Sequence, residues 1–169
     1  MKKNLVLVGM MAVGKTTLAK IVAKKYNLKF VDTDANIRRK NSMSIAEIFE
    51  KKGENFFRKE EEKEVLKSLK RDNCIIALGG GAFINKNIRE NILKNAISIW
   101  LDLDIETLNS RINQNYKRPL LNKDNNRTKL KHLYAERKNI YELADHKIEC
   151  SRLSKKHIAD KVIEIYEKY

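Results

Sequence analysis

An eight-residue motif near the start of the chain has the composition of a phosphate-binding loop. Residues 9–16 read GMMAVGKT and match the pattern G-x-x-x-x-G-K-[ST], with an apolar run before them and a helix-like segment after them. Gly9 and Gly14 allow a tight backbone whose N–H groups point at an anion, and the following helix adds partial positive charge. Lys15 can then reach the β- and γ-phosphates of a nucleoside triphosphate, while the Thr16 hydroxyl can hold Mg²⁺. The expected nucleotide-binding residues are Gly9, Met10, Met11, Ala12, Val13, Gly14, Lys15, Thr16 and Thr17.

Two aspartates follow a second apolar run in the stretch KFVDTDAN. If the strand continued through both, the carboxylates of Asp32 and Asp34 would point to the same side and repel one another. A cation and a bound hydroxyl would relieve that repulsion. Asp32 is then placed to hold Mg²⁺ through water, and Asp34 to take a proton from a substrate hydroxyl or simply to orient it. The structural alternative is that Asp34 caps the helix that begins with ANIRRK.

Two further segments suggest how an acceptor molecule is bound. The three glycines 79–81 follow a third apolar run, and three are more than a turn needs, so backbone N–H groups there are expected to approach a ligand closely. A flexible turn is the alternative. Arg58 follows Phe56 and Phe57, and an arginine flanked by aromatic rings suits a planar carboxylate over an apolar ring.

Short apolar runs alternate with helical segments, which favours a parallel sheet covered by helices on both faces. The predicted strands are residues 5–8, 29–32, 74–78, 96–101 and 147–150. The predicted helices are residues 15–26, 34–41, 44–52, 54–71, 86–94, 104–113, 127–143 and 154–168. Because functional groups gather at the carboxyl ends of parallel strands, the phosphate loop, the two aspartates and the glycines should face one crevice.

Three local patterns refine this outline. Ser44 and Glu47 have the spacing of a capping box. The polar, aperiodic segment 114–126, QNYKRPLLNKDNN, carries the only proline and is expected to be a mobile loop or lid. In ISIWLDLD, Asp102 follows a strand as a Walker-B aspartate would, but a helix cap at Asp102 or Asp104 is favoured.

The composition fits one globular domain, with 169 residues of which 42% are hydrophobic. The net charge is +14, but the lysines are dispersed among acidic residues, so a small anionic substrate is expected and no nucleic acid. No apolar run approaches the roughly 20 residues of a membrane span, so no membrane association is expected. Cys74 and Cys150 lie far apart in no metal or redox spacing, as expected in a reducing cytoplasm.

Taken in order, the motifs resemble those of the shikimate kinase family. They are GMMAVGKT, DTD, SIAEIFEKKGENFFRKEE, GGGA, KRPLL and ERKNIYELAD, and the resemblance covers essentially the whole chain. It implies a three-layer α/β P-loop kinase fold with a five-stranded parallel sheet, in a single domain over residues 1–169 with a mobile lid at about 114–126. It also implies transfer of the γ-phosphoryl group of ATP, with Mg²⁺, to the 3-hydroxyl of shikimate, on the route to chorismate and aromatic amino acids. A cytoplasmic monomer is expected.

The same resemblance implies roles for individual residues on the acceptor side. Asp34 resembles the family aspartate that binds shikimate hydroxyls and acts as a base, and Asp32 the one associated with Mg²⁺. Arg58 and Arg137 resemble the pair that clamps the substrate carboxylate. The further residues implied are Gly80 and Gly81, as backbone contacts to the substrate.

On the nucleotide side, Arg118 in KRPLL resembles the lid arginine that closes over the phosphates. Arg111 resembles the residue that lies against the adenine, with Arg152 on the other side of that base. Lys15, Asp34 and Arg118 would together form the catalytic set.

The sequence also departs from the family pattern. Ala12 stands where many members have another glycine, which should stiffen the loop without adding bulk, and Thr16 replaces the more common serine while keeping the hydroxyl. Asn139 replaces the proline of R-x-P-x-Y and weakens the placement of Arg137.

The alternative functions are those of another small-metabolite kinase of this fold, such as a gluconate kinase, or of a nucleoside monophosphate kinase. A P-loop protein that binds nucleic acid is a further alternative, suggested only by the charge.

Overall fold

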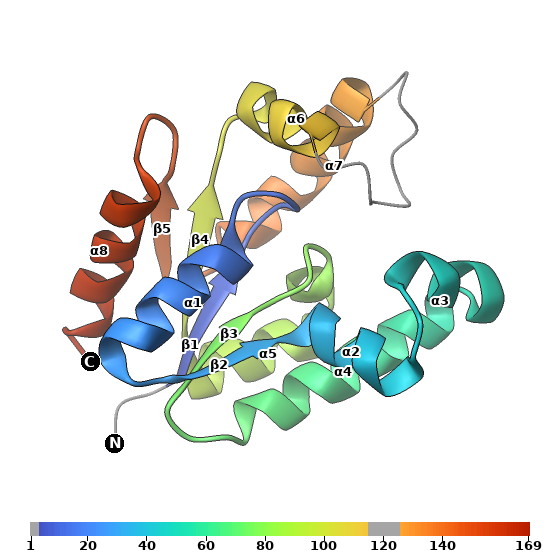
Figure 1. Ribbon diagram of the computed structural model, residues 1–169, viewed down its shortest axis with the longest axis horizontal. Coiled ribbons are helices and arrows are strands. Elements are labelled where there is room, and N and C mark those ends of the chain that lie inside the picture. Colours follow the sequence, from blue (N-terminus) through green and yellow to red (C-terminus); the bar gives the residue numbers. More distant parts are fainter. Residues whose placement is uncertain (1–3, 115–125) are drawn as a thin grey trace.

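The chain is built around a five-stranded parallel sheet, as predicted (Figure 1). The computed structural model describes residues 4–114 and 126–169. The strand order is β2-β3-β1-β4-β5, and each strand lies within one residue of its predicted bounds. The strands are β1 (Asn4–Val8), β2 (Lys29–Asp32), β3 (Cys74–Ala77), β4 (Ala96–Asp102) and β5 (His146–Glu149).

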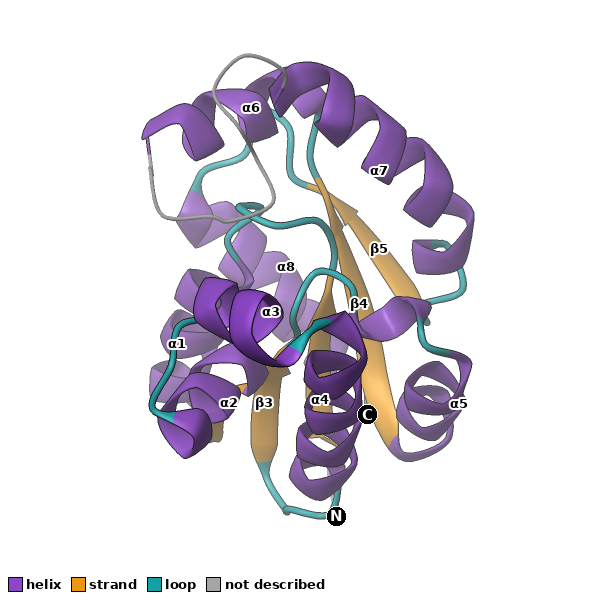
Figure 2. Cartoon of the chain, turned by 90° about the vertical axis from the view of Figure 1, so that its right-hand side faces the viewer, coloured by secondary structure: helices purple, strands orange, loops and turns teal. Residues whose placement is uncertain are grey.

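Helices cover both faces of this sheet. Helices α1 and α8 pack together on one face, while α4, α5 and α7 lie on the other (Figures 1 and 2). Every predicted helix is present within two residues of its predicted ends. They are α1 (Lys15–Tyr26), α2 (Thr33–Asn41), α3 (Ile45–Lys52), α4 (Glu54–Leu69), α5 (Lys86–Asn95), α6 (Ile105–Gln114), α7 (Asn126–Tyr141) and α8 (Lys155–Tyr166), with a short 3₁₀ turn η1 (Ala82–Ile84).

The burial of the central strand β1 on both faces explains why its sequence is a continuous apolar run and not an alternating pattern. All five residues of β1 are buried, because helices cover both of its faces and β3 and β4 flank its edges. Leu7 is in register with Ala77 of β3, and Ala77 with Asp32 of β2. The carboxyl ends of β1, β2 and β3 are therefore aligned, and the segments that follow them emerge side by side.

The two aspartates after β2 are arranged differently from the prediction. The strand stops at Asp32, whose Oδ1 accepts a hydrogen bond from the Ala35 N–H at 2.9 Å and so caps α2. Asp34 already lies in the first turn of that helix. The expectation that a strand would point both carboxylates the same way was wrong. The structural alternative, in which Asp34 caps the helix, is also wrong, because Asp32, the aspartate nearest the strand, satisfies the free N–H groups.

The other local predictions have clear outcomes. Ser44 and Glu47 form the predicted capping box at the start of α3. Asp104 accepts hydrogen bonds from the N–H and hydroxyl of Thr107, each at 2.8 Å, as a helix-capping aspartate does. Residues 115–125, which hold Arg118 and nearly all of the expected lid, lie outside the described residues. In the part of the chain that is described, no helix has the length and apolar character to cross a membrane.

The junction between β4 and β5 is held by hydrogen bonds between the buried Ser98 and the exposed Asp145. Asp145 Oδ2 accepts hydrogen bonds from the backbone N–H and the hydroxyl of Ser98, at 2.8 and 2.7 Å, and Ser98 is fully buried. Asp145 lies directly before β5, whose pairing with β4 begins at Ile99 and His146. Its side chain therefore accepts from the Ser98 N–H, which lies beyond the paired residues.

We predict that Asp145→Ala lowers the free energy of unfolding by about 1–3 kcal/mol, because it leaves two buried donors of Ser98 without an acceptor. For a chain of this size each kcal/mol corresponds to a fall in melting temperature of about 2–4 °C. Thermal unfolding followed by circular dichroism measures the change. Asp145→Asn keeps one oxygen acceptor and is the matched control, so equal melting temperatures for wild type and Asp145→Ala would contradict the assignment.

Candidate active site

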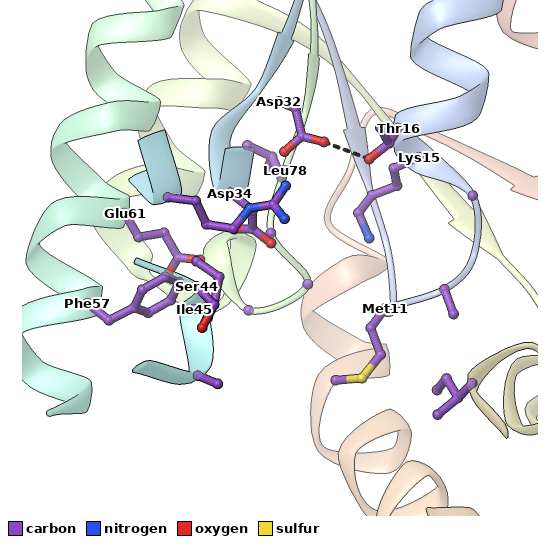
Figure 3. Close-up of a pocket in the computed structure, with 18 of the residues that line it drawn as sticks. Met11, Lys15, Thr16, Asp32, Asp34, Ser44, Ile45, Phe57, Glu61 and Leu78 are labelled. Carbon is purple, nitrogen blue, oxygen red and sulfur yellow. Dashed lines mark hydrogen bonds between the residues drawn. The ribbon is translucent and has the colours of Figure 1, made fainter. Parts of the chain in front are cut away.

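A cleft of about 960 Å³ opens at the carboxyl ends of β1, β2 and β3 (Figure 3). Its walls come from the phosphate loop, the starts of α1 and α2, helices α3 and α4, and the turn after β3. Two residues of α6 and one residue each of α7 and α8 complete them. The volume is at the upper end of the range found for small-molecule sites. The predicted crevice is therefore present, and it brings residues from both ends of the chain together.

The phosphate loop has the strained backbone that its motif requires. Gly9 and Gly14 have φ angles of 140° and 110°, and a Cβ on Gly9 would lie 2.5 Å from the Leu101 carbonyl oxygen. Lys15 is almost fully buried, and its Nζ donates hydrogen bonds to the carbonyls of Gly9 and Met10 at 2.7 and 2.8 Å. The ammonium is thus held at the mouth of the loop.

The alanine that departs from the family pattern lies at an unfavourable position. Ala12 has a φ of 62°, a left-handed conformation that costs a non-glycine residue about 1–2 kcal/mol. Arg111 of α6 donates to the carbonyls of Ala12 and Val13, at 3.3 and 3.0 Å. This contact supports the loop from the side of α6.

The two residues expected to hold a metal ion are in direct contact. The Thr16 hydroxyl donates to Asp32 Oδ2 at 2.8 Å, as the dashed line in Figure 3 shows. A hydroxyl and a carboxylate are ligands that suit Mg²⁺. The residues that the structure describes contain no group of three or more His, Cys, Asp or Glu that could hold a metal ion. A Mg²⁺ ion at this point would need further oxygen ligands from nucleotide phosphates and water.

The glycines after β3 are required by the side chains packed against them. A Cβ on Gly79 would lie 2.6 Å from Asp34 Oδ1 and 2.9 Å from Glu61 Oε1. A Cβ on Gly81 would lie 2.7 Å from Arg58 Nη1. This backbone therefore forms a bare surface on which two carboxylates and a guanidinium come together.

Glu61 is a member of this cluster that the sequence interpretation missed. It is only 2% exposed, and its Oε2 accepts a hydrogen bond from Arg58 Nη1 at 2.8 Å. Burial raises the pKa of the Glu61 carboxyl even though Arg58 acts to lower it; nearby Asp34 adds to the rise and Arg137 opposes it. The Arg58–Glu61 spacing of three in a helix could have suggested the pair, but not its burial.

Helix α7 contributes the second arginine of the cleft. Arg137 Nη1 donates to the Gly80 carbonyl at 3.4 Å, and the buried Tyr141 hydroxyl donates to the same oxygen. Since Gly80 lies between Gly79 and Gly81, Arg137 contacts the same turn that Arg58 packs against. The two predicted arginines are thus brought together although 79 positions separate them (137 − 58).

Most of the predicted site residues line the cleft. Those that do are Met11, Ala12, Gly14, Lys15, Thr16, Thr17, Asp32, Asp34, Arg58, Gly80, Gly81, Arg111 and Arg137. Met10 and Val13 are buried beneath the loop instead.

Three cationic positions differ from the expectation or add to it, and one aspartate agrees with it. Arg152 lies on the exposed turn before α8 with a φ of 65° and does not line the cleft, so its contact with the base stays a prediction. Lys155, the first residue of α8, does line it, as does Arg38 of α2, and neither was singled out from the sequence. Asp102 is not among the lining residues, which agrees with the preference against a Walker-B role.

Comparisons with known proteins agree on one family. The family model described as "Shikimate kinase" matches residues 11–167. A shikimate kinase from Sulfurihydrogenibium sp. is 38% identical over 161 residues, covering 95% of this chain and 96% of that protein. One from Bacillus subtilis is 39% identical over 170 residues, covering 96% and 88%. Among solved structures, a shikimate kinase from Acinetobacter baumannii in complex with shikimate has a TM-score of 0.94 at 32% identity, covering 99% and 94%.

The buried carboxyl supplies a prediction about protonation. Because Arg58 lowers the pKa of Glu61, Arg58→Met should raise that pKa further. Because the pKa of Glu61 is higher in the folded protein than in the unfolded chain, the folded protein holds this proton more tightly. Glu61 therefore makes folding less favourable as the pH rises from about 4.5, the ordinary pKa, through the raised pKa of the folded protein. NMR of the side-chain carboxyl carbons measures the titration of Glu61, and the Glu61 signal is identified by its absence in Glu61→Gln. Arg39→Met is the control on an exposed arginine outside the cleft, and an unchanged or lower Glu61 pKa in Arg58→Met would contradict the cluster.

Proposed function

The chain belongs to the shikimate kinase family, and from this we propose that it transfers the γ-phosphoryl group of ATP to the 3-hydroxyl of shikimate. The observation that carries the proposal is the meeting of three elements in one cleft. These are a phosphate loop, a carboxylate at Asp34, and the guanidinium groups of Arg58 and Arg137. The first suits a triphosphate, and the others suit an acceptor that has both hydroxyls and a carboxylate.

On the nucleotide side, the loop N–H groups and the α1 N-terminus would hold the phosphates, with Lys15 neutralising charge that builds up during transfer. Mg²⁺, when bound, would offset the negative charge of the phosphates. Thr16 and Asp32 are the residues placed to hold it. Arg111 would lie along the base, and Arg118, as the resemblance implies, would add positive charge near the transferring group.

On the acceptor side, Arg58 and Arg137 would grip the carboxylate of shikimate from two directions. Glu61 keeps the Arg58 guanidinium in place through the bond at 2.8 Å. Asp34 would accept a hydrogen bond from a hydroxyl and either take its proton or orient it. Phosphoryl transfer needs little covalent chemistry from the protein, so positioning of this kind supplies most of the catalysis.

The finer expectations belong to the same proposal. The product would be shikimate 3-phosphate, on the route to chorismate and aromatic amino acids. The enzyme would act as a single-domain cytoplasmic monomer, with a lid at about 114–126 and no nucleic-acid partner.

The direct test is ATP consumption in a coupled assay with shikimate, gluconate, nucleoside monophosphates or no acceptor. The proposal expects turnover with shikimate alone, and the product identified as the 3-phosphate by ³¹P NMR. Turnover with gluconate or a nucleoside monophosphate in place of shikimate would assign a different acceptor to the same fold.

We predict that Lys15→Met lowers turnover by at least about 10²-fold, because it removes a preorganised charge from the transition state. Lys24→Met, on the exposed side of the same helix, is the matched control and should leave turnover unchanged. Circular dichroism checks that both variants fold. A Lys15→Met enzyme with wild-type turnover would remove Lys15 from the mechanism.

We also predict that Asp34→Asn loses about 10²–10⁴-fold in kcat while ATP still binds, since an amide cannot take up a proton. Steady-state rates and calorimetric titration with ATP measure the two properties separately. A much smaller loss would indicate that Asp34 orients the hydroxyl without acting as a base. Loss of ATP affinity with retained turnover would instead give Asp34 the metal-binding role assigned to Asp32.

A further inference from the structure

One face of α7 carries three polar side chains that reach the sheet. Tyr134, Arg137 and Tyr141 are spaced by three and four residues, so they lie on the same side of the helix. The Tyr134 hydroxyl donates to Asp102 Oδ1 at 3.0 Å, at the carboxyl end of β4. Tyr141, one turn beyond Arg137, donates to the Gly80 carbonyl after β3. Arg137 is thus flanked on both sides by hydroxyl contacts that tie the helix to the sheet.

Asp102 is held in place by contacts that do not involve α7. Lys147 of β5 forms an ion pair with Asp102 Oδ2 at 3.0 Å, and the Asp102 carbonyl accepts a hydrogen bond from the Cys150 N–H at 2.7 Å. The Asp102 side chain is only 12% exposed. It therefore gives Tyr134 a fixed acceptor, and burial together with this bond raises the pKa of the Tyr134 hydroxyl.

The same lysine connects the two tyrosine contacts. Lys147 Nζ lies 4.5 Å from the ring centroid of Trp100, and the Trp100 ring lies 6.0 Å from that of Tyr141. The end of β4 and the start of β5 thus support both ends of the stretch of α7 that carries Arg137. A small rotation of this helix about its axis would displace the Arg137 guanidinium, and displacements of about 1 Å can cost a site on the order of 10²-fold.

We propose that Tyr134 is a positioning residue which, by its hydrogen bond to Asp102, fixes the rotation of α7 and so aims Arg137 at the acceptor carboxylate. This inference rests on the proposed function, in which Arg137 binds that carboxylate. Tyr134 does not line the cleft, so its effect on the acceptor acts through Arg137. It follows that Tyr134 should influence the acceptor and not the nucleotide.

The test is a double-mutant cycle with Tyr134→Phe and Arg137→Ala, using shikimate as the varied substrate. Tyr134→Phe removes only the hydroxyl, and it should raise KM for shikimate by about tenfold while leaving KM for ATP and the melting temperature close to wild type. In the Arg137→Ala background the same change should have no further effect on kcat/KM. That ratio is read from the linear range of rate against concentration, so weak acceptor binding does not prevent the measurement.

Tyr26→Phe is the matched control, because the Tyr26 hydroxyl also donates to a carboxylate, that of Glu167, away from the cleft. It should leave both KM values unchanged. The proposal is overturned if Tyr134→Phe, like Tyr26→Phe, leaves KM for shikimate unchanged, or if it raises KM for ATP as much as KM for shikimate. It is also overturned if Tyr134→Phe lowers kcat/KM by the same factor in the Arg137→Ala background as in the wild type. A wild-type enzyme without activity on shikimate would overturn the proposed function. A wild-type enzyme that is active on shikimate, together with a Tyr134→Phe variant that has the same KM for shikimate, would overturn only the positioning role of Tyr134.

Discussion

The turn after β3 leaves no room for a Cβ at Gly79 or Gly81 while the charged side chains beside them keep their positions. A Cβ on Gly79 would fall within 2.6 Å of the Asp34 carboxylate, and one on Gly81 within 2.7 Å of the Arg58 guanidinium. Real Cβ atoms do not approach other atoms so closely, so a side chain at either glycine would displace the carboxylates or the guanidinium packed against it. Helices α2, α4 and α7 each direct one or more charged side chains onto it, and their relative positions follow from that shared contact surface.

The same close approach forces charges into a confined space. Glu61 is buried beside Asp34, and burial raises the pKa of the Glu61 carboxyl, while Arg58 and Arg137 act to lower it. A buried ion pair contributes little net stability because desolvation cancels most of the attraction. The Arg58–Glu61 pair matters here because it fixes the position of the guanidinium. In the proposed function, an acceptor carboxylate would therefore meet a guanidinium that is already in place. A separate apolar cluster of Ile37, Ile48 and Phe57 joins α2, α3 and α4, and so supports this wall independently of the main core.

The sequence allowed the strands, the helices and the phosphate loop to be predicted because each is specified locally. The apolar runs, the caps at Ser44 and Asp104, and the strand–loop–helix around GMMAVGKT are each specified by contiguous residues, and the structure confirms them. The residues that were missed depend on long-range packing. The burial of Glu61 follows from its contact with a turn 18 positions later (79 − 61), and the approach of Lys155 to the cleft follows from the position of α8. Asp34 was placed in the right cleft by an incorrect argument, because the helix begins one residue earlier than expected.

The central claim is that the paired arginines recognise a carboxylate on the acceptor. The most direct measurement is the ratio of kcat/KM for shikimate to that for its neutral carboxamide, in the wild type and in Arg58→Met. The account predicts a wild-type ratio on the order of 10³ or more, because a site built for a charged group rejects an analogue that leaves its polar groups unpaired. It also predicts that the ratio falls sharply in Arg58→Met. A wild-type enzyme that used the acid and the carboxamide equally well would contradict it.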